Sequence, residues 1–456
     1  MVWRRTDEDT VTDATRDHPN APAPWAAHAI WWHVYPLGFV GAEKQATASE
    51  HAGGTVVAHR LGRLEAWLEY AVDLGCSGIA LGPIFTSETH GYDTIDHFTV
   101  DPRLGDEDDF RHLVEAAHTR GLRILLDGVF NHVGRSFPRL ADVLARGEES
   151  PHAAWFRRAR GGALATFEGH ESLVALNHHE PQVIDYVADV MDHWLARGAD
   201  GWRLDAAYAV PTSFWRAVLD RVRSAHPNAW FVGEVIHGDY ARIVQESGFD
   251  SVTQYELWKA LWSSINDVNL FELAWAIERH NRFVEVFAPM TFVGNHDVTR
   301  IASQLTDLRH LPHALVALFT LAGVPSVYAG DEQAFRGVKE HRAGGDDAIR
   351  PAFPSAPSEL LSEGWPVYRL HQQLAGLRRR HPWLHRATTE ITLRRNAVLA
   401  YRCRSGEEQL DVVLNLDDRP VTIDAATASA LAGTAEVSAT TVTVPPHDWF
   451  VYRAAQ

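Results

Sequence analysis

The feature that most constrains the fold is a regular alternation of short apolar runs with longer amphipathic segments. The first run begins at Ile30 and the last covers 325–328. Eight strand candidates occur, and each is followed by helical hydrophobic spacing, ending with a helix expected over 365–380. Eight such units predict a parallel (β/α)₈ barrel. A doubly wound open sheet is the alternative, but no glycine-rich phosphate loop favours it.

The expected elements follow one another along most of the chain. The strands are expected at 30–35, 77–81, 122–127, 201–205, 230–233, 250–252, 290–293 and 325–328. The helices are expected at 61–74, 107–119, 183–198, 213–225, 240–246, 257–287, 311–322 and 365–380.

Two segments fall outside this alternation. Residues 134–180 are too long and irregular for an ordinary loop, and they predict a small inserted domain after the third strand. From residue 385 to 456 the pattern changes to period two and to β-forming residues, which predicts a C-terminal antiparallel β domain. The barrel is then formed by 29–133 and 181–384, after a flexible leader at 1–28.

Composition excludes several classes of function. A net charge of −17 argues against nucleic acid, which needs a concentrated basic face. No apolar run approaches the length of a membrane span, and the first 28 residues lack the apolar core of a signal peptide. The two cysteines, Cys76 and Cys403, lie far apart and suit a reducing compartment. We therefore expect a cytoplasmic protein, and its oligomeric state is left open.

Polar residues gather where the expected strands end. In a parallel barrel, the carboxyl ends of the strands meet at the rim that carries active sites. Arg203 and Asp205 are two residues apart on one strand, so their side chains point the same way. A structural salt bridge would explain this pair alone, but like charges converging on one rim repel one another and argue for chemistry. The rim residues are Asp127, Asn131, His132, Arg203, Asp205, Glu234, Asn295, His296 and Asp297, with His90, Tyr92 and Asp93 in the loop after the second strand.

The chain resembles the α-amylase family of retaining α-glucan enzymes on four short segments. These segments are DGVFNH at 127–132, GWRLD at 201–205, GEV at 233–235 and FVGNHD at 292–297. Within that family, 201–205, 214–216, 233–235 and 330–332 are most similar to the neopullulanase and cyclomaltodextrinase group. The resemblance implies the barrel, the inserted domain and a C-terminal β-sandwich.

The resemblance also implies roles for individual residues. Asp205 is the expected nucleophile, Glu234 the general acid/base and Asp297 the transition-state stabiliser. Arg203 should keep Asp205 ionised, whereas Glu234 should begin the reaction protonated. Asp127 is expected to brace the rim. The expected substrate-binding residues are Tyr92, Asp93, His132, Arg203, His296 and Arg300, with the two histidines donating to sugar hydroxyls and Tyr92 stacking under the ring.

The expected activity is hydrolysis of α-glucosidic bonds in malto-oligosaccharides by double displacement. The main linkage is α-1,4, with α-1,6 as a second candidate, and the only expected partner is a small α-glucan substrate. One alternative is a transglycosylase or a sucrose- or trehalose-type enzyme on the same scaffold. A different class, a non-catalytic carbohydrate-binding subunit, is disfavoured because all three catalytic acids are present.

Two further expectations concern the surroundings of the site. No cofactor is expected, and the calcium site that many amylases build beside the inserted domain should be absent. That site uses an asparagine, which this chain keeps as Asn131, an acid near the position of Ala175, and a backbone oxygen after the nucleophile, where Ala209 lies near the expected histidine. Asp93 and Arg300 are expected to pair and close the non-reducing end of the site, so that one glucosyl unit is released at a time.

Overall fold

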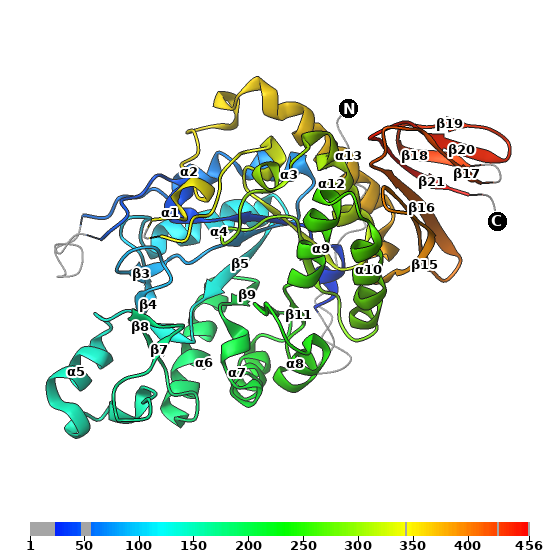
Figure 1. The fold of residues 1–456 in the computed structure, drawn as a ribbon. Coiled ribbons are helices and arrows are strands. Elements are labelled where there is room, and N and C mark those ends of the chain that lie inside the picture. Colours follow the sequence, from blue (N-terminus) through cyan, green and yellow to red (C-terminus); the bar gives the residue numbers. More distant parts are fainter. Residues whose placement is uncertain (1–22, 47–55, 343, 426–427, 455–456) are drawn as a thin grey trace.

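The fold was analysed in a computed structural model, which describes residues 23–46, 56–342, 344–425 and 428–454 (Figure 1). Its centre is an eight-stranded parallel sheet in the order β11-β10-β9-β5-β2-β1-β13-β12. A parallel bridge between Thr253 and Met290 joins the two ends of this sheet. The sheet therefore closes into the predicted barrel. Its strands are β1 (Trp31–Val34), β2 (Gly78–Leu81), β5 (Arg123–Gly128), β9 (Gly201–Leu204), β10 (Trp230–Gly233), β11 (Ser251–Val252), β12 (Met290–Phe292) and β13 (Val324–Tyr328).

Helices surround the barrel and bury their apolar faces against it (Figure 1). The longer ones are α3 (Leu68–Leu74), α4 (Glu107–Thr119), α6 (Pro181–Leu195), α7 (Thr212–Ala225), α8 (Tyr240–Ser247), α9 (Tyr255–Asn266), α10 (Phe271–Val284), α12 (Leu311–Thr320) and α13 (Trp365–Arg380). Short helices lie at α1 (Pro36–Phe39), α2 (Gly62–Glu65) and α11 (Ile301–Gln304).

One stretch that was predicted as a single long helix is interrupted in the structure. The stretch 257–287 forms two helices, α9 and α10, rather than one. The break lies at Val268, which takes a left-handed φ of 48°. The N–H of Leu270 donates to the carbonyl of Asn396 at 2.8 Å, a contact with the C-terminal domain that hydrophobic spacing does not encode.

The amino-terminal end of the barrel is closed by aromatic rings. Trp31 and Trp230 stack there with centroids 5.7 Å apart, and Trp25 packs edge-on against Trp31 at 5.9 Å. Trp25 belongs to the 3₁₀ helix η1 (Pro24–His28), whose Ala26 is buried. The prediction of a flexible leader is therefore wrong for 24–28, because apolar packing against the barrel orders them. Residues 1–22 lie outside the described residues.

The segment between β5 and α6 contains a small sheet and a helix. The strands β6 (His132–Val133), β8 (His170–Ala175) and β7 (Thr166–Phe167) pair antiparallel, and helix α5 is Pro138–Arg146. Because β6 begins four residues after β5 ends, this small sheet starts at the carboxyl-end rim of the barrel. A second hairpin on the same rim joins β3 (Phe85–Ser87) to β4 (Thr94–Val100).

The C-terminal residues form two antiparallel sheets packed face to face, as predicted. One has the order β14-β15-β16-β21-β18 and the other β17-β20-β19. Buried apolar side chains, including Val398, Val413, Val442 and Phe450, fill the space between them. This sandwich lies beside α10 and α13 (Figure 1). Its strands are β14 (Thr388–Arg394), β15 (Val398–Ser405), β16 (Glu408–Asn415), β17 (Val421–Asp424), β18 (Ser429–Gly433), β19 (Glu436–Val437), β20 (Thr441–Val444) and β21 (Trp449–Arg453).

Across the described part of the chain, no helix combines the length and the apolar character that a bilayer crossing requires.

Candidate active site

Arg203 is the centre of the carboxylate cluster at the barrel rim. Its Nη1 lies 2.8 Å from Asp127 and 3.0 Å from Asp205, and its Nη2 lies 2.7 Å from Glu234. All four side chains are buried. The expected contact between Arg203 and Asp205 is confirmed. Since Asp205 and Glu234 contact the two ends of one guanidinium, their carboxyl groups lie side by side.

A tight turn after β9 connects these two acids through the backbone. Ala206 takes a left-handed conformation with φ of 45° and ψ of 37°, which costs energy for a residue with a side chain. In this conformation its N–H donates to Glu234 Oε2 at 2.9 Å. The N–H of Glu234 donates to the carbonyl of Leu204 at 2.9 Å. The residue after Asp205 therefore fixes the position of Glu234.

Asp297 follows β12 and approaches the cluster from another side of the barrel. Its Oδ2 lies 2.9 Å from His296 Nε2, and its Oδ1 lies 2.9 Å from Arg350 Nη2. The side chain of Asp297 is 30% exposed, against 11% for Asp205. Asp297 is therefore the more accessible of the two carboxylates.

Tyr92 lies against the same cluster, as expected. Its ring is parallel to that of His296 with centroids 5.3 Å apart, and its hydroxyl donates to Asp127 at 3.0 Å. The hydroxyl also contacts His296 Nε2. The loop after β2 is thus joined to β5 and to the loop after β12 at one point.

The structure gives both predicted histidines protein partners. His132 Nε2 lies 3.0 Å from the carbonyl of Tyr92, and its Nδ1 lies 3.0 Å from the amide nitrogen of Asn131. His296 Nδ1 lies 3.2 Å from His33, and its Nε2 is bound to Asp297. Both rings therefore hold neighbouring site residues in place, Tyr92 and Asp297, and their contacts with sugar hydroxyls remain a prediction.

The prediction that Asp93 pairs with Arg300 is wrong. Arg300 is 1% exposed and donates to Asp331 at 2.9 Å, with its guanidinium over the ring of Tyr328. Asp93 accepts instead from the N–H and the hydroxyl of Thr89. Arg300 lies beneath the rim because the loop after β13 brings Asp331 next to it, and sequence spacing could not reveal that contact.

Arg350 occupies the place that was expected for Arg300. It contacts Asp297 and, at 3.0 Å, Asp346, and its Nε donates to the carbonyl of His296 at 2.9 Å. Its guanidinium lies over the ring of Tyr35, 4.7 Å from the centroid. Arg350 lies far from any strand end, in the loop between β13 and α13, so the sequence carried no signal for it.

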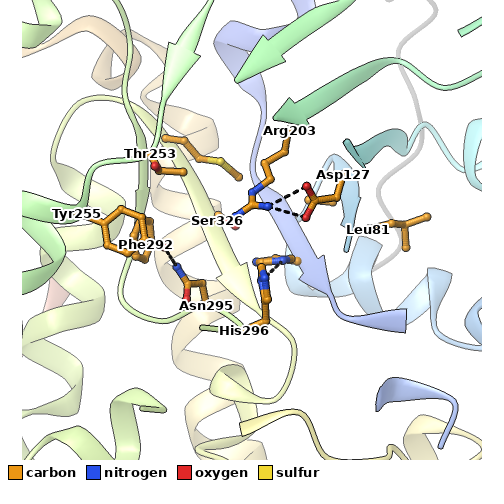
Figure 2. A pocket seen from close by; sticks show the side chains of 12 residues that line it. Leu81, Asp127, Arg203, Thr253, Tyr255, Phe292, Asn295, His296 and Ser326 are labelled. Atoms are coloured by element: carbon orange, nitrogen blue, oxygen red, sulfur yellow. Dashed lines mark hydrogen bonds and ion pairs between the residues drawn. The ribbon is translucent and has the colours of Figure 1, made fainter. Parts of the chain in front are cut away.

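A second missed residue is Tyr255, whose hydroxyl donates to Glu234 Oε1 at 3.2 Å. Asn295 donates to the same hydroxyl at 2.8 Å. Tyr255 comes three residues after β11, and the rule that functional side chains follow barrel strands could have found it. Tyr255 and Asn295 line a pocket (Figure 2). Its polar lining includes Asp127, Arg203 and His296, and its apolar lining includes Leu81 and Phe292.

The acids differ in their proton affinities. Burial raises the pKa of the Asp205 carboxyl well above its ordinary value, Arg203 opposes this rise, and Glu234 adds to it. Arg203 was expected to keep Asp205 ionised, and in the site without substrate its charge offsets only part of the effect of burial on that pKa. Burial would also raise the pKa of Asp297, but His296, Arg350 and Arg203 together hold that pKa well below its ordinary value. Asp297 is thus the carboxylate that stays charged.

The sequence of this chain matches a known protein family. A profile described as alpha amylase, catalytic domain, matches residues 35–166 and 163–393. The chain belongs to the α-amylase family. As a member it is a glycoside hydrolase, and the predicted enzyme class is confirmed.

Relatives of this α-amylase-family chain extend over most of its length. A cyclomaltodextrinase from a Bacillus species is 30% identical over 431 residues, which cover 87% of this chain and 74% of that protein. An intracellular maltogenic amylase from Bacillus subtilis is 28% identical, over 69% of this chain and 56% of that protein. The solved structure of a debranching enzyme from Nostoc punctiforme aligns with a TM-score of 0.80 and 25% identity, covering 95% of this chain and 99% of that one.

Removal of divalent metal is expected to leave the activity of this enzyme unchanged. Calcium prefers six to eight oxygen ligands with carboxylates prominent, and Ala175 provides no side-chain oxygen at the position of the expected acid. We expect the rate of maltotriose hydrolysis in EDTA to equal the rate in buffer. A loss of activity that added Ca²⁺ restores would contradict this prediction.

Removal of Arg350 is expected to weaken catalysis through Asp297. Arg350→Ala deletes a charged partner of that carboxylate and should reduce kcat/KM on maltotriose by roughly 10²-fold, as loss of one preorganised charged group typically does. Arg342→Ala, on the same loop but exposed and paired with Glu340, is the control and should leave kcat/KM unchanged. Equal effects of the two variants would exclude a role for Arg350 at the site.

Proposed function

We propose that this enzyme hydrolyses α-glucosidic bonds in small α-glucans with retention of configuration, through a covalent glycosyl-enzyme. In this proposal Asp205 is the nucleophile, Glu234 the general acid/base and Asp297 the stabiliser of the transition state. The observation that carries the proposal is the placement of Asp205 and Glu234 on the two ends of the Arg203 guanidinium, from neighbouring strands.

The reaction begins when Glu234 protonates the glycosidic oxygen and Asp205 attacks the anomeric carbon. The leaving sugar departs, and an ester joins the glucosyl unit to Asp205. Water then attacks the anomeric carbon while Glu234 takes a proton from it. The ester breaks, Asp205 is released and Glu234 is protonated again. Asp297, kept charged by His296 and Arg350, stabilises the positive charge that develops on the ring in both steps.

The electrostatics of the cluster bear on how many protons it holds rather than on which acid holds them. Three carboxyls, Asp127, Asp205 and Glu234, surround the single guanidinium of Arg203. Burial of this excess negative charge favours retention of a proton within the cluster. Such a proton is shared by the interacting carboxyls and is not assigned to one residue. The proposed mechanism needs that proton on Glu234 when the substrate is bound.

We propose malto-oligosaccharides as the substrates, with α-1,4 as the main linkage. The names of the relatives, a cyclomaltodextrinase and a maltogenic amylase, support this class, and the name debranching enzyme supports α-1,6 as a second linkage. The ring of Tyr92, which lies parallel to that of His296, suits stacking against a sugar. A relative named intracellular, together with buried and unpaired Cys76 and Cys403, supports a cytoplasmic location.

We infer that Arg350 and Asp346 close the non-reducing end of the site, in place of the pair first expected. Arg350 is 9% exposed and Asp346 is 36% exposed, so the carboxylate can accept from a terminal sugar hydroxyl while Arg350 orients it. A closed end restricts the enzyme to one glucosyl unit beyond the bond that is cleaved.

The early products of maltoheptaose test this proposal. We expect glucose and maltohexaose as the first products, and chromatography of samples from the first few per cent of conversion measures them. An immediate spread of mid-length products would show an open cleft and overturn the closed end. The same chromatograms reveal longer oligosaccharides if the glucosyl unit is transferred to sugar rather than to water.

A further inference from the structure

Two histidines and an aspartate converge where the C-terminal sandwich meets the barrel. Asp307 and His310 lie at the two ends of the 3₁₀ helix η5 (Leu308–His310), just before α12, and His447 lies in the turn between β20 and β21. His310 Nε2 and His447 Nδ1 are 3.0 Å apart. One carboxylate oxygen of Asp307 and one ring nitrogen of each histidine all lie within 4.8 Å of one another. The catalytic proposal uses none of the three.

The ring of His447 is oriented by a carboxylate. Its Nε2 lies 2.7 Å from Asp418 Oδ1, so Nε2 carries the proton and donates it. Nδ1 is then a bare lone pair that faces His310. A carboxylate that fixes the tautomer of a histidine in this way is the usual outer partner of a metal ligand. His447 also takes a left-handed φ of 53°, a conformation that costs energy and turns this residue toward the barrel.

The surrounding charges suit a cation. Asp307 and Asp418 provide two negative charges, and Arg309 provides one positive charge through its contact with Asp307 at 2.6 Å. The arginine side chain is 61% exposed, so a cation can displace it at little cost. His313 packs against the ring of His310 with centroids 5.2 Å apart, and its Nε2 is engaged by the carbonyls of Asn415 and Asp448, each at 3.1 Å.

We propose that Asp307, His310 and His447 form a binding site for a divalent transition-metal ion of the Zn²⁺ class. Two imidazole nitrogens and one carboxylate oxygen are a ligand set that Zn²⁺ takes in proteins, with water as the fourth ligand. Without metal, His310 donates from Nε2 to Nδ1 of His447. Metal binding replaces this hydrogen bond and moves the proton of His310 to Nδ1, so that Nε2 can bind the ion. Because the ligands come from the barrel and from the sandwich, the bound ion ties the two domains together.

The test uses the full chain without a histidine tag, stripped of metal with EDTA and then dialysed. Titration with ZnCl₂ in a calorimeter is expected to show one high-affinity ion per chain, and saturating Zn²⁺ is expected to raise Tm by several degrees. Asp307→Asn, which alters an exposed turn, and His447→Ala should each weaken zinc binding by at least about 10-fold. Arg309→Ala removes the competing cation and should strengthen binding or leave it unchanged.

A second cluster of similar composition is the control. His59 lies beside Asp106 and Asp109, whose carboxylates form the capping box at the start of α4. Asp307 also caps a helix, since it accepts from the N–H of Arg309 at 2.9 Å, but the His59 cluster offers one imidazole where the proposed site offers two. His59→Ala should therefore leave the stoichiometry and the Tm shift unchanged. Absence of stoichiometric binding in the wild type would overturn the site, as would wild-type affinity in folded Asp307→Asn and His447→Ala. Loss of binding in His59→Ala alone would place the ion elsewhere and equally overturn it.

Discussion

Asp205→Asn is expected to reduce kcat on maltotriose by at least about 10⁴-fold, the scale of loss when a nucleophile is removed. The amide has nearly the shape of the carboxylate, so packing at the end of β9 is preserved. Its oxygen is a far weaker nucleophile, and the ester with the glucosyl unit cannot form at a useful rate. Initial rates over a long incubation, together with circular dichroism and Tm, measure both the loss and the intact fold.

Asp127→Asn is the matched control for this variant. Asp127 contacts the same Nη1 atom of Arg203 at 2.8 Å but has no bond-making role in the proposed mechanism. We expect a clearly smaller loss of kcat for Asp127→Asn than for Asp205→Asn. Near-normal turnover by purified Asp205→Asn would overturn the assignment of the nucleophile.

Glu234→Gln is expected to affect substrates according to their leaving groups. On maltotriose, whose leaving sugar needs protonation, kcat should fall by about 10²- to 10⁴-fold, the usual contribution of a general acid. On an aryl α-glucoside with an acidic phenol, formation of the glycosyl-enzyme should remain fast, because that phenol leaves without a proton. Hydrolysis of the ester should then be slow, because no base activates water. A burst of phenol followed by a slow steady rate is the expected time course.

Azide provides the positive control for this variant. Azide is a nucleophile that needs no general base, so it should restore steady turnover of the aryl glucoside by Glu234→Gln and yield the α-glucosyl azide. Tyr255→Phe, which removes only the hydroxyl donated to Glu234 at 3.2 Å, should retain both half-reactions. Equal losses of Glu234→Gln on both substrates, without a burst, would contradict its role as acid and base.

The fold could be predicted from the sequence because strand and helix periodicities differ and repeat eight times. The positions of Asp205, Glu234 and Asp297 at the rim followed from the same pattern, because parallel strands present their carboxyl ends together. Their catalytic roles rest on family resemblance and remain a prediction. Local breaks were not predictable, as the left-handed Val268 between α9 and α10 shows, because tertiary contacts decide them.

Side-chain partners were the least predictable feature. Arg300 and Arg350 are both arginines near the rim, and only the path of the long loop after β13 decides which of them reaches Asp297. Sequence spacing carries no information about that path. The same limit applies to His132, whose ring nitrogens are both engaged by neighbouring protein groups.

The most direct test of the account is to identify the residue that carries the glucosyl unit during turnover. Glu234→Gln is incubated with an activated fluoroglucosyl donor, quenched in acid, digested and sequenced by mass spectrometry. We predict one modified peptide, with the sugar esterified to Asp205, and no modified peptide when Asp205→Asn is added to the same background. A sugar on any other residue, or a donor consumed with no covalent adduct in acid-quenched samples, would contradict the account.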